Sequence, residues 1–356
     1  MTTFYNILFS LLLGLHIGFS QPAIDAEMKP SNWETPKNAK FETFEGKQTL
    51  LLDGKATLKN VTFINGTIQV DVYANTKRSF AGIFFRKQNQ TMEEVYMRLH
   101  KSNQVDAVQY SPTFNNELTW QLYREHQAQF TFKQKGWNTL RLEIKNRELT
   151  VFVNNEKVLT VENMKTDFYE GSIGLFSLFP NRFTNFRYTP DTKNHNIKPN
   201  NAKLLNTSFI TNWKITPARL YNEAGFKLKD KLFKKTLTVT TDESGLLAIS
   251  KYLDKSSSGN FEKNDEMYTI ASTTIEASKK QTKRLYFDYS DKVIVYLNGH
   301  PIFKGNNAFR SKGVQFMGHL NVETNSLYLP LKTGKNLIQF VVIDKANGWG
   351  LISKLD

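Results

Sequence analysis

Several side chains in the first half of this 356-residue chain are of types that can hold a ligand rich in hydroxyl groups. Between Val95 and His100, apolar residues alternate with Tyr96, Arg98 and His100, so these three would share one face of a strand. Aromatic faces pack against C–H groups, and planar groups with several donors bind hydroxyls, which together suit a sugar. The candidate ligand-binding residues are Tyr96, Arg98, His100, Gln109, Tyr110, Gln121 and Tyr123.

Packing is an alternative role for the aromatic side chains in this region. The rings of Tyr96 and Tyr123 would also suit a sheet surface that is covered by other aromatic groups. Trp120 shares parity with Leu118 and Leu122, so the alternation assigns Trp120 to the core. Binding and packing interpretations therefore compete at these positions.

Glycoside hydrolysis would require a pair of carboxylates, either about 5 Å or about 6.5–9.5 Å apart. Glu93 and Glu94 are adjacent in a predicted turn, and on a strand they would face apart. Glu125 and Asp106 remain as catalytic candidates, although they come from different segments. The carboxylate pattern therefore favours binding over catalysis.

Metal and cofactor signatures are absent from the sequence. The chain has no cysteine, and its six histidines, at positions 16, 100, 126, 195, 300 and 319, lack the short spacing of metal ligands. It contains no nucleophile elbow, phosphate loop or dinucleotide fingerprint. We therefore predict no cofactor and no metal site, with a structural calcium ion held by loop oxygens left open.

The elements that would position these side chains are strands with a period of two. Apolar Leu140, Leu142 and Ile144 alternate with charged residues, and Asn154-Asn155 suits the positive φ of a tight hairpin. A second hairpin is predicted at Asn298-Gly299, within the run DKVIVYLNGHPIFKG. The pattern predicts an all-β chain with two antiparallel β-sandwich (jelly-roll) domains in tandem.

Chain length and composition shifts predict the domain organisation. A chain of 356 residues exceeds the usual size of one core. We expect a signal peptide at 1–20, a loose lead-in at 21–39, a first sandwich at 40–189, a polar linker at 190–203 and a second sandwich at 204–356.

The apolar run at 7–19 carries the prediction of export. It is short for a membrane span but suits the core of a signal peptide, although no Lys or Arg precedes it. An uncleaved anchor is the alternative. With the signal removed, we expect no transmembrane segment and a periplasmic or extracellular protein.

The charge balance is basic. The chain has 47 Lys and Arg against 33 Asp and Glu, and residues 191–356 hold 25 of the former and 15 of the latter. Such a surface would attract anionic partners, including acidic polysaccharide, but scattered lysines also serve solubility. Nucleic acid is the least favoured partner, because no nucleic-acid-binding module is present.

Two stretches of sequence resemble known jelly rolls. The segments TFINGTIQVDVYANTKRSFAGIFFR and GSIGLFSLFPNRFTNFRY resemble concanavalin A-like lectin/glucanase (laminin-G-like) domains over about residues 40–190. The segments SDKVIVYLNGHPIFKG and SLYLPLKTGKNLIQFVVIDKANGWG resemble galactose-binding-like domains over about 204–356. The first resemblance implies that the candidate ligand-binding residues line a concave sheet. The Glu-x-Asp-x-x-Glu run common in glucanases on this scaffold is missing.

These observations together predict an exported, non-catalytic carbohydrate-binding protein that holds a glycan on the concave face of its first sandwich. One alternative is a glycoside hydrolase or related sugar-processing enzyme of the concanavalin A-like class. A structural surface protein is the second alternative.

Overall fold

The structure, a computed structural model, describes residues 22–75, 77–191, 203–204, 206–228, 234–255 and 263–356. The predicted signal peptide at 1–20 and most of the predicted linker at 190–203 lie outside these residues. No helix within the described ranges has both the length and the apolar character that crossing a membrane requires.

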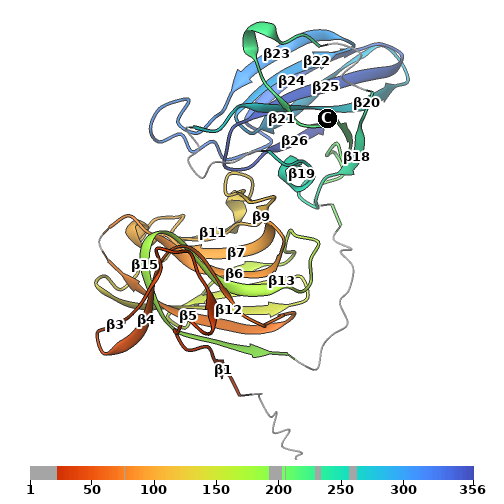
Figure 1. Cartoon of the computed structure of the whole chain (residues 1–356). Helices are drawn as coiled ribbons and strands as arrows, with labels where there is room; N and C mark the ends of the chain where they lie inside the picture. Colours follow the sequence, from red (N-terminus) through yellow and green to blue (C-terminus); the bar gives the residue numbers. More distant parts are fainter. Residues whose placement is uncertain (1–21, 76, 192–202, 205, 229–233, 256–262) are drawn as a thin grey trace, which may run out of the picture.

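The first sandwich is an antiparallel 15-stranded sheet that folds around one apolar core (Figure 1). Its strands are β1 (Ile24–Asp25), β2 (Trp33–Glu34), β3 (Lys40–Phe44), β4 (Lys47–Leu58), β5 (Gly66–Ala74), β6 (Phe80–Gln88), β7 (Thr91–Met97), β8 (Val108–Tyr110), β9 (Thr113–Phe114), β10 (Glu117–Leu118), β11 (Gln127–Ala128), β12 (Gly136–Lys145), β13 (Glu148–Val153), β14 (Glu156–Val161) and β15 (Ser172–Pro190), with short 3-10 helices η1 (Leu99–Lys101) and η2 (Arg124–His126). The first half of β15 pairs with β6 and the second half with β5. This long strand therefore links the two layers of the sandwich.

Period-two burial builds the core, as predicted. In β12 the side chains of Leu140, Leu142 and Ile144 are buried, and they alternate with more exposed neighbours. Asn154 and Asn155 adopt φ values of 50° and 69° in the turn between β13 and β14. The predicted hairpin is confirmed.

The segment expected to be a loose lead-in instead packs on the first sandwich. Strand β1 pairs with β15, and β2 pairs with β4. Trp33 is only 2% exposed and contacts the ring of Phe186 edge-on. The apolar residues Ala26, Met28 and Trp33 bury enough surface to hold this segment in place.

The second sandwich packs a seven-stranded sheet against a four-stranded sheet. The larger sheet holds β16 (Asn212–Ile215), β17 (Arg219–Leu220), β18 (Leu237–Thr240), β20 (Met267–Ala277), β22 (Lys292–Leu297), β23 (His300–Asn306) and β25 (Gly334–Asp344); the smaller holds β19 (Leu246–Ala248), β21 (Gln281–Tyr289), β24 (Asn325–Leu331) and β26 (Gly350–Leu355); η3 (Glu223–Gly225) and η5 (Ile249–Lys251) are 3-10 turns. Asn298 and Gly299 form the predicted turn, with φ values of 51° and 84°. The prediction of two all-β antiparallel sandwiches is confirmed.

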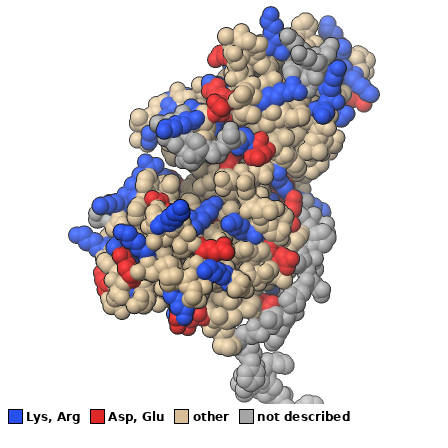
Figure 2. Space-filling model, in the orientation of Figure 1, with Lys and Arg blue, Asp and Glu red and all other residues tan. Residues whose placement is uncertain are grey.

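One segment of the first sandwich reaches into the second. Residues 112–126, which include β9, β10 and η2, extend toward β19 (Figure 1). Phe114, Leu122 and Tyr123 form a small apolar cluster with Leu246 and Ala248 of the second sandwich. The surface is hollowed where the two sandwiches meet (Figure 2).

Candidate functional site

A pocket of about 380 Å³ lies between the two sandwiches. This volume is within the range of small-molecule sites. The first sandwich contributes Lys55, Arg78, Phe80, Glu94, Tyr96, Arg98, Gln109, Thr113, Asn116, Glu117, Leu118, Trp120, Phe176 and Leu178, and the second contributes Asn264, Phe309, Met317, Ala346 and Asn347. The predicted face of the first sandwich therefore lines a pocket, but the second sandwich covers that face in part.

Strand β7 supplies the floor of the pocket through its alternation. Val95 and Met97 are buried in the core of the first sandwich, so Glu94 and Tyr96 face the other way and line the pocket. Tyr96 pairs with Gln109 of the neighbouring strand β8, which brings Gln109 to the same face. Adjacent strands thus place a carboxylate, a phenol and an amide side by side.

Four buried residues of this floor have polar atoms without a hydrogen-bond partner. Glu94, Arg98, Gln109 and Thr113 are each at most 8% exposed. Glu94 Oε2, Arg98 Nε, Gln109 Nε2 and Thr113 Oγ1 have no hydrogen bond to any described residue, whereas Glu94 Oε1 lies 2.7 Å from Lys55 Nζ. A buried polar atom left unsatisfied costs about 1–3 kcal/mol, and buried polar atoms are normally paired. All four residues line the pocket, so they are the candidate hydrogen-bonding residues of the site.

The charges on the floor are partly compensated. Lys55 Nζ lies 2.7 Å from a carboxylate oxygen of Glu94, and Lys55 is the more exposed partner. Arg98 forms an ion pair with Asp106. Because ion pairs offset the charges of Glu94, Lys55 and Arg98, this part of the pocket suits a ligand that is uncharged or nearly so.

Tyr96 orients the amide of Gln109. Its hydroxyl donates a hydrogen bond to Gln109 Oε1, so the Gln109 Nε2 donor is left for the pocket. Burial raises the pKa of Tyr96, and the phenol stays protonated at neutral pH.

A row of aromatic rings accompanies these polar groups. The ring of Tyr96 lies 5.7 Å from that of Phe176 and 6.2 Å from that of Phe80. The guanidinium of Arg98 is 5.4 Å from the Phe80 ring, and Lys55 Nζ is 5.8 Å from the Phe176 ring. Rings beside planar donors provide the two kinds of contact that sugars require.

The loop between β23 and β24 carries part of the opposite wall. Phe309 and Met317 of this loop line the pocket. The buried carboxylate of Asp288 accepts hydrogen bonds from Asn307 Nδ2 at 2.6 Å and from the backbone N–H of Asn321 at 2.9 Å. Asp288 therefore anchors both ends of the loop that presents these two side chains.

Trp120 is a pocket residue, and its assignment to the core is wrong. Its Nε1 donates to Asn347 Oδ1 at 3.0 Å, and its ring meets that of Phe309 edge-on at 5.8 Å. Strand β10 ends at Leu118, so the alternation that linked Trp120 to Leu122 stops two residues earlier. Trp120 joins the two sandwiches at the pocket.

Three candidate ligand-binding residues lie away from the pocket lining. Tyr110 pairs with Val95 and belongs to the core, where its hydroxyl donates to Glu93 at 2.6 Å. Tyr123 belongs to the apolar cluster between the sandwiches. Gln121 is 1% exposed, and its Nε2 donates to the backbone oxygen of Met317 at 2.6 Å. None of these three residues lines the pocket between the sandwiches.

His100 lies at the end of the aromatic row but outside the pocket lining. Strand β7 ends at Met97, and His100 is in η1, so the predicted strand does not extend that far. Its Nδ1 lies 2.9 Å from the backbone oxygen of Ser79, and its ring is 5.0 Å from that of Phe80. Burial lowers the pKa of His100, so it is neutral at pH 7.

The two catalytic candidates do not form a pair. Asp106 is bound by Arg98. Glu125 is in η2, with about half of its side chain exposed, and its carboxylate lies 3.7 Å from His126 Nε2. Burial lowers the pKa of His126 to about 4, so this contact involves a neutral imidazole at pH 7. Among the described residues, no cluster of three or more His, Asp or Glu could hold a metal ion.

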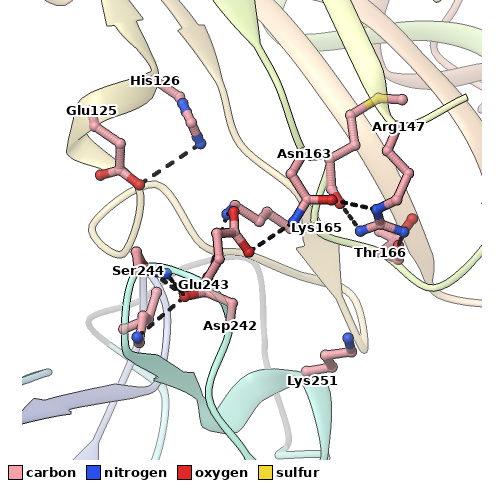
Figure 3. Close-up of polar contacts among 12 residues, drawn as sticks. Glu125, His126, Arg147, Asn163, Lys165, Thr166, Asp242, Glu243, Ser244 and Lys251 are labelled. Carbon is pink, nitrogen blue, oxygen red and sulfur yellow. Dashed lines mark hydrogen bonds and ion pairs between the residues drawn. The ribbon is translucent and has the colours of Figure 1, made fainter. Parts of the chain in front are cut away.

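A second polar cluster joins the two sandwiches (Figure 3). Lys165, in the loop before β15, forms ion pairs with Asp242 and Glu243 in the loop between β18 and β19. Asn163 Nδ2 donates to Glu243 at 2.7 Å, and the Arg147 guanidinium donates to Asn163. These contacts hold one sandwich against the other.

Acidification should weaken this cluster. Burial raises the pKa of Glu243, but Lys165 more than offsets that effect, so the net pKa is lowered from 4.5. A lowered pKa stabilises the fold above pH 4.5, and this contribution is lost as the pH falls through the folded-state value. Thermal unfolding measured from pH 3 to pH 7 should show a steeper loss of stability below pH 4.5 in the wild type than in Glu243→Gln. If stability falls equally with pH in the wild type and in Glu243→Gln, the Glu243 carboxylate is not the source of the pH dependence.

Several pocket residues were missed by the sequence analysis. Glu94 is two residues before Tyr96 in the same alternation, so extending that strand toward Thr91 would have found it. Phe80 and Phe176 read only as apolar strand residues. Phe309, in a loop of the other sandwich, carries no local sequence signal at all.

Comparison with known proteins gives the following likenesses. The carbohydrate-binding module CBM66 from Bacillus subtilis is 13% identical, with a TM-score of 0.34, over 45% of this chain and 92% of that one. A putative glycosyl hydrolase from Parabacteroides distasonis is 13% identical, with a TM-score of 0.34, and the match covers 45% of this chain and 94% of that one. A Bacillus licheniformis beta-glucanase is 11% identical, with a TM-score of 0.34, and the match covers 48% of this chain and 98% of that one.

No curated protein matches the chain. The sandwich at 24–190 agrees with the concanavalin A-like resemblance, whereas the galactose-binding-like assignment of the second sandwich stays a prediction. Residues 27–188, which include every first-sandwich residue that lines the pocket, match the family model of the 3-keto-alpha-glucoside-1,2-lyase-like domain.

Proposed function

We propose that this chain binds a saccharide in the pocket between its two sandwiches. The observation that carries the proposal is the convergence of unpaired polar atoms on one aromatic-lined pocket. Glu94 Oε2 is an unpaired acceptor and Gln109 Nε2 an unpaired donor, so together they match a hydroxyl group that both donates and accepts. Phe80 and Phe176 offer faces for the C–H side of a sugar ring.

The family match supports a sugar ligand. The description of the matched domain refers to a glucoside, and the matched residues contain the whole floor of the pocket. The pocket volume of about 380 Å³ suits one or two sugar units better than a long polysaccharide chain.

Glu94→Gln should weaken saccharide binding. The substitution keeps the shape of the side chain but replaces one acceptor oxygen with a donor, in a site where the carboxylate is buried. We expect a loss of about 1–3 kcal/mol, or roughly 10- to 100-fold in Kd. A glycan array would select the ligand, and titration calorimetry would measure both proteins.

Glu143→Gln is the matched control for this substitution. Glu143 is in the same sandwich, is exposed and forms an ion pair with Arg141. It should bind like the wild type. An equal Kd for Glu94→Gln and wild type would contradict the proposal, and no binding to any glycan would favour the structural surface protein.

A second candidate function is the elimination that the family description names. A 3-keto group acidifies the C2 proton, so a base that removes it allows the C1–O bond to break. Glu94 lines the pocket and would be the base in this reaction, and Lys55 beside it would stabilise negative charge on the substrate. Formation of an unsaturated keto sugar from a 3-keto-glucoside, abolished by Glu94→Gln, would establish catalysis over simple binding.

We also propose that the protein is exported to the periplasm or the cell exterior, on the basis of the apolar run at 7–19. The basic surface would add weak attraction for acidic polysaccharide. Array binding at two salt concentrations separates binding in the pocket from attraction to the basic surface, because only the attraction to the basic surface weakens as salt rises.

A further inference from the structure

We infer that the natural ligand is a glycoside with an apolar, ring-containing aglycone, rather than a free sugar or an oligosaccharide. This inference rests on the proposed function, because it names the ligand class of the same pocket. It follows from the division of the pocket into a polar floor and an apolar wall.

The polar floor belongs to the first sandwich. Glu94, Gln109 and Thr113 are at most 2% exposed and hold atoms with no hydrogen bond within the described part of the chain. A sugar bound here would satisfy these atoms. The sugar moiety is therefore placed against β7, β8 and β9.

The opposite wall is apolar. It is formed by Phe309, Met317 and Ala346 of the second sandwich, together with Leu118 and Trp120. A free sugar filling the whole pocket would press hydroxyl groups against this wall, where burial of an unpaired hydroxyl is unfavourable.

Polar side chains near this wall are already engaged by the protein. Asn347 Oδ1 accepts from Trp120 Nε1, and Asn264 Nδ2 donates to the backbone oxygen of Lys345 at 3.1 Å. Glu117 accepts from Ser250 Oγ at 2.8 Å. The wall therefore offers packing surface to a ligand and few hydrogen bonds.

The mouth of the pocket extends the apolar surface. Leu178, which lines the pocket, is 44% exposed, and its neighbour Phe179 is 39% exposed. Phe179 has a φ of 70°, which is uncommon for a bulky residue. Its backbone oxygen accepts from Ser177 Oγ at 2.8 Å and from Asn181 Nδ2 at 2.9 Å, which hold it in this conformation.

Arg78 completes this mouth. Its guanidinium lies 5.6 Å from the ring of Phe80 and 5.5 Å from that of Phe179. An aryl aglycone that leaves the pocket would meet aromatic and cationic faces on one side and Leu178 on the other. Sugar and aglycone would thus each face matching surface.

The test compares methyl and 2-naphthyl glycosides of glucose, galactose and xylose by titration calorimetry with the full chain. We expect the 2-naphthyl glycoside to bind about 10- to 100-fold tighter than the methyl glycoside of the same sugar. Phe309→Ala should weaken binding of the 2-naphthyl glycoside more than binding of the methyl glycoside, so the ratio should fall to near one. Phe316→Ala, in the same loop but outside the pocket lining, is the matched control and should keep the ratio.

The outcomes separate the inference from the proposed function. Equal affinity for methyl and 2-naphthyl glycosides would overturn the inference and leave saccharide binding intact. Binding of free 2-naphthol as tightly as of its glycosides, or insensitivity of all affinities to Glu94→Gln, would overturn both.

Discussion

Replacing Lys255 with methionine should lower the free energy of unfolding by about 3–5 kcal/mol, because it leaves two carboxylates buried without a counter-ion. The Lys255 side chain is 3% exposed, and its Nζ lies 2.7 Å from Glu117 of the first sandwich and contacts Asp344 of the second. Urea denaturation would measure the loss. The contact between the sandwiches should weaken with it.

Lys251→Met is the matched control. Lys251 also bridges the sandwiches, through an ion pair with Asp167 at 2.8 Å, but the Asp167 side chain is 72% exposed. An exposed pair contributes about 0–1 kcal/mol, so this variant should unfold close to the wild type. Similar losses in both variants would mean that burial at Lys255 is not the source of the effect.

Gly348→Ala should separate the two walls of the pocket. A Cβ at Gly348 would lie 2.8 Å from Leu122 Cγ and 3.0 Å from Thr119 Cα, and the glycine has a φ of 121°. Overpacking of this kind costs about 1–3 kcal/mol in addition to backbone strain. The preceding residue, Asn347, accepts a hydrogen bond from Trp120 in the pocket. Saccharide affinity should therefore also fall by roughly tenfold, or about 1.4 kcal/mol.

Gly334→Ala controls for the backbone strain. Gly334 has a φ of 86°, but a Cβ there would meet no atom within 4 Å. We expect a modest loss of stability and an unchanged Kd, measured by thermal unfolding and calorimetry. If both variants bind with wild-type affinity, the pocket does not depend on the contact between the sandwiches.

Period-two alternation predicted the fold class and part of the site. Tyr96 and Arg98 line the pocket, as their place on one strand face predicted, and Gln109 of the neighbouring strand also lines it. Gln109 and Tyr110 are consecutive residues of β8, so they point to opposite faces, and Tyr110 lies in the core. Strand ends were also misplaced, which displaced His100.

The second wall lay beyond local sequence patterns. Met317 reaches the pocket only because a buried carboxylate, Asp288, ties down its loop and because the two sandwiches pack together. Packing between domains depends on residues far apart in the chain. The second sandwich contributes directly to the candidate site, which was predicted on the first sandwich alone.

The site therefore depends on both sandwiches. The first provides hydrogen-bonding atoms from Glu94 and Gln109, and the second provides an apolar wall around Phe309. Ion pairs at Lys165 and Lys255 keep the two surfaces in contact.

The most direct measurement is a crystal structure of the protein with the tightest-binding glycoside from the array. The account predicts the sugar in the interdomain pocket, with hydroxyls hydrogen-bonded to Glu94 and Gln109. A glycoside bound elsewhere on the surface, with these two side chains untouched, would contradict it.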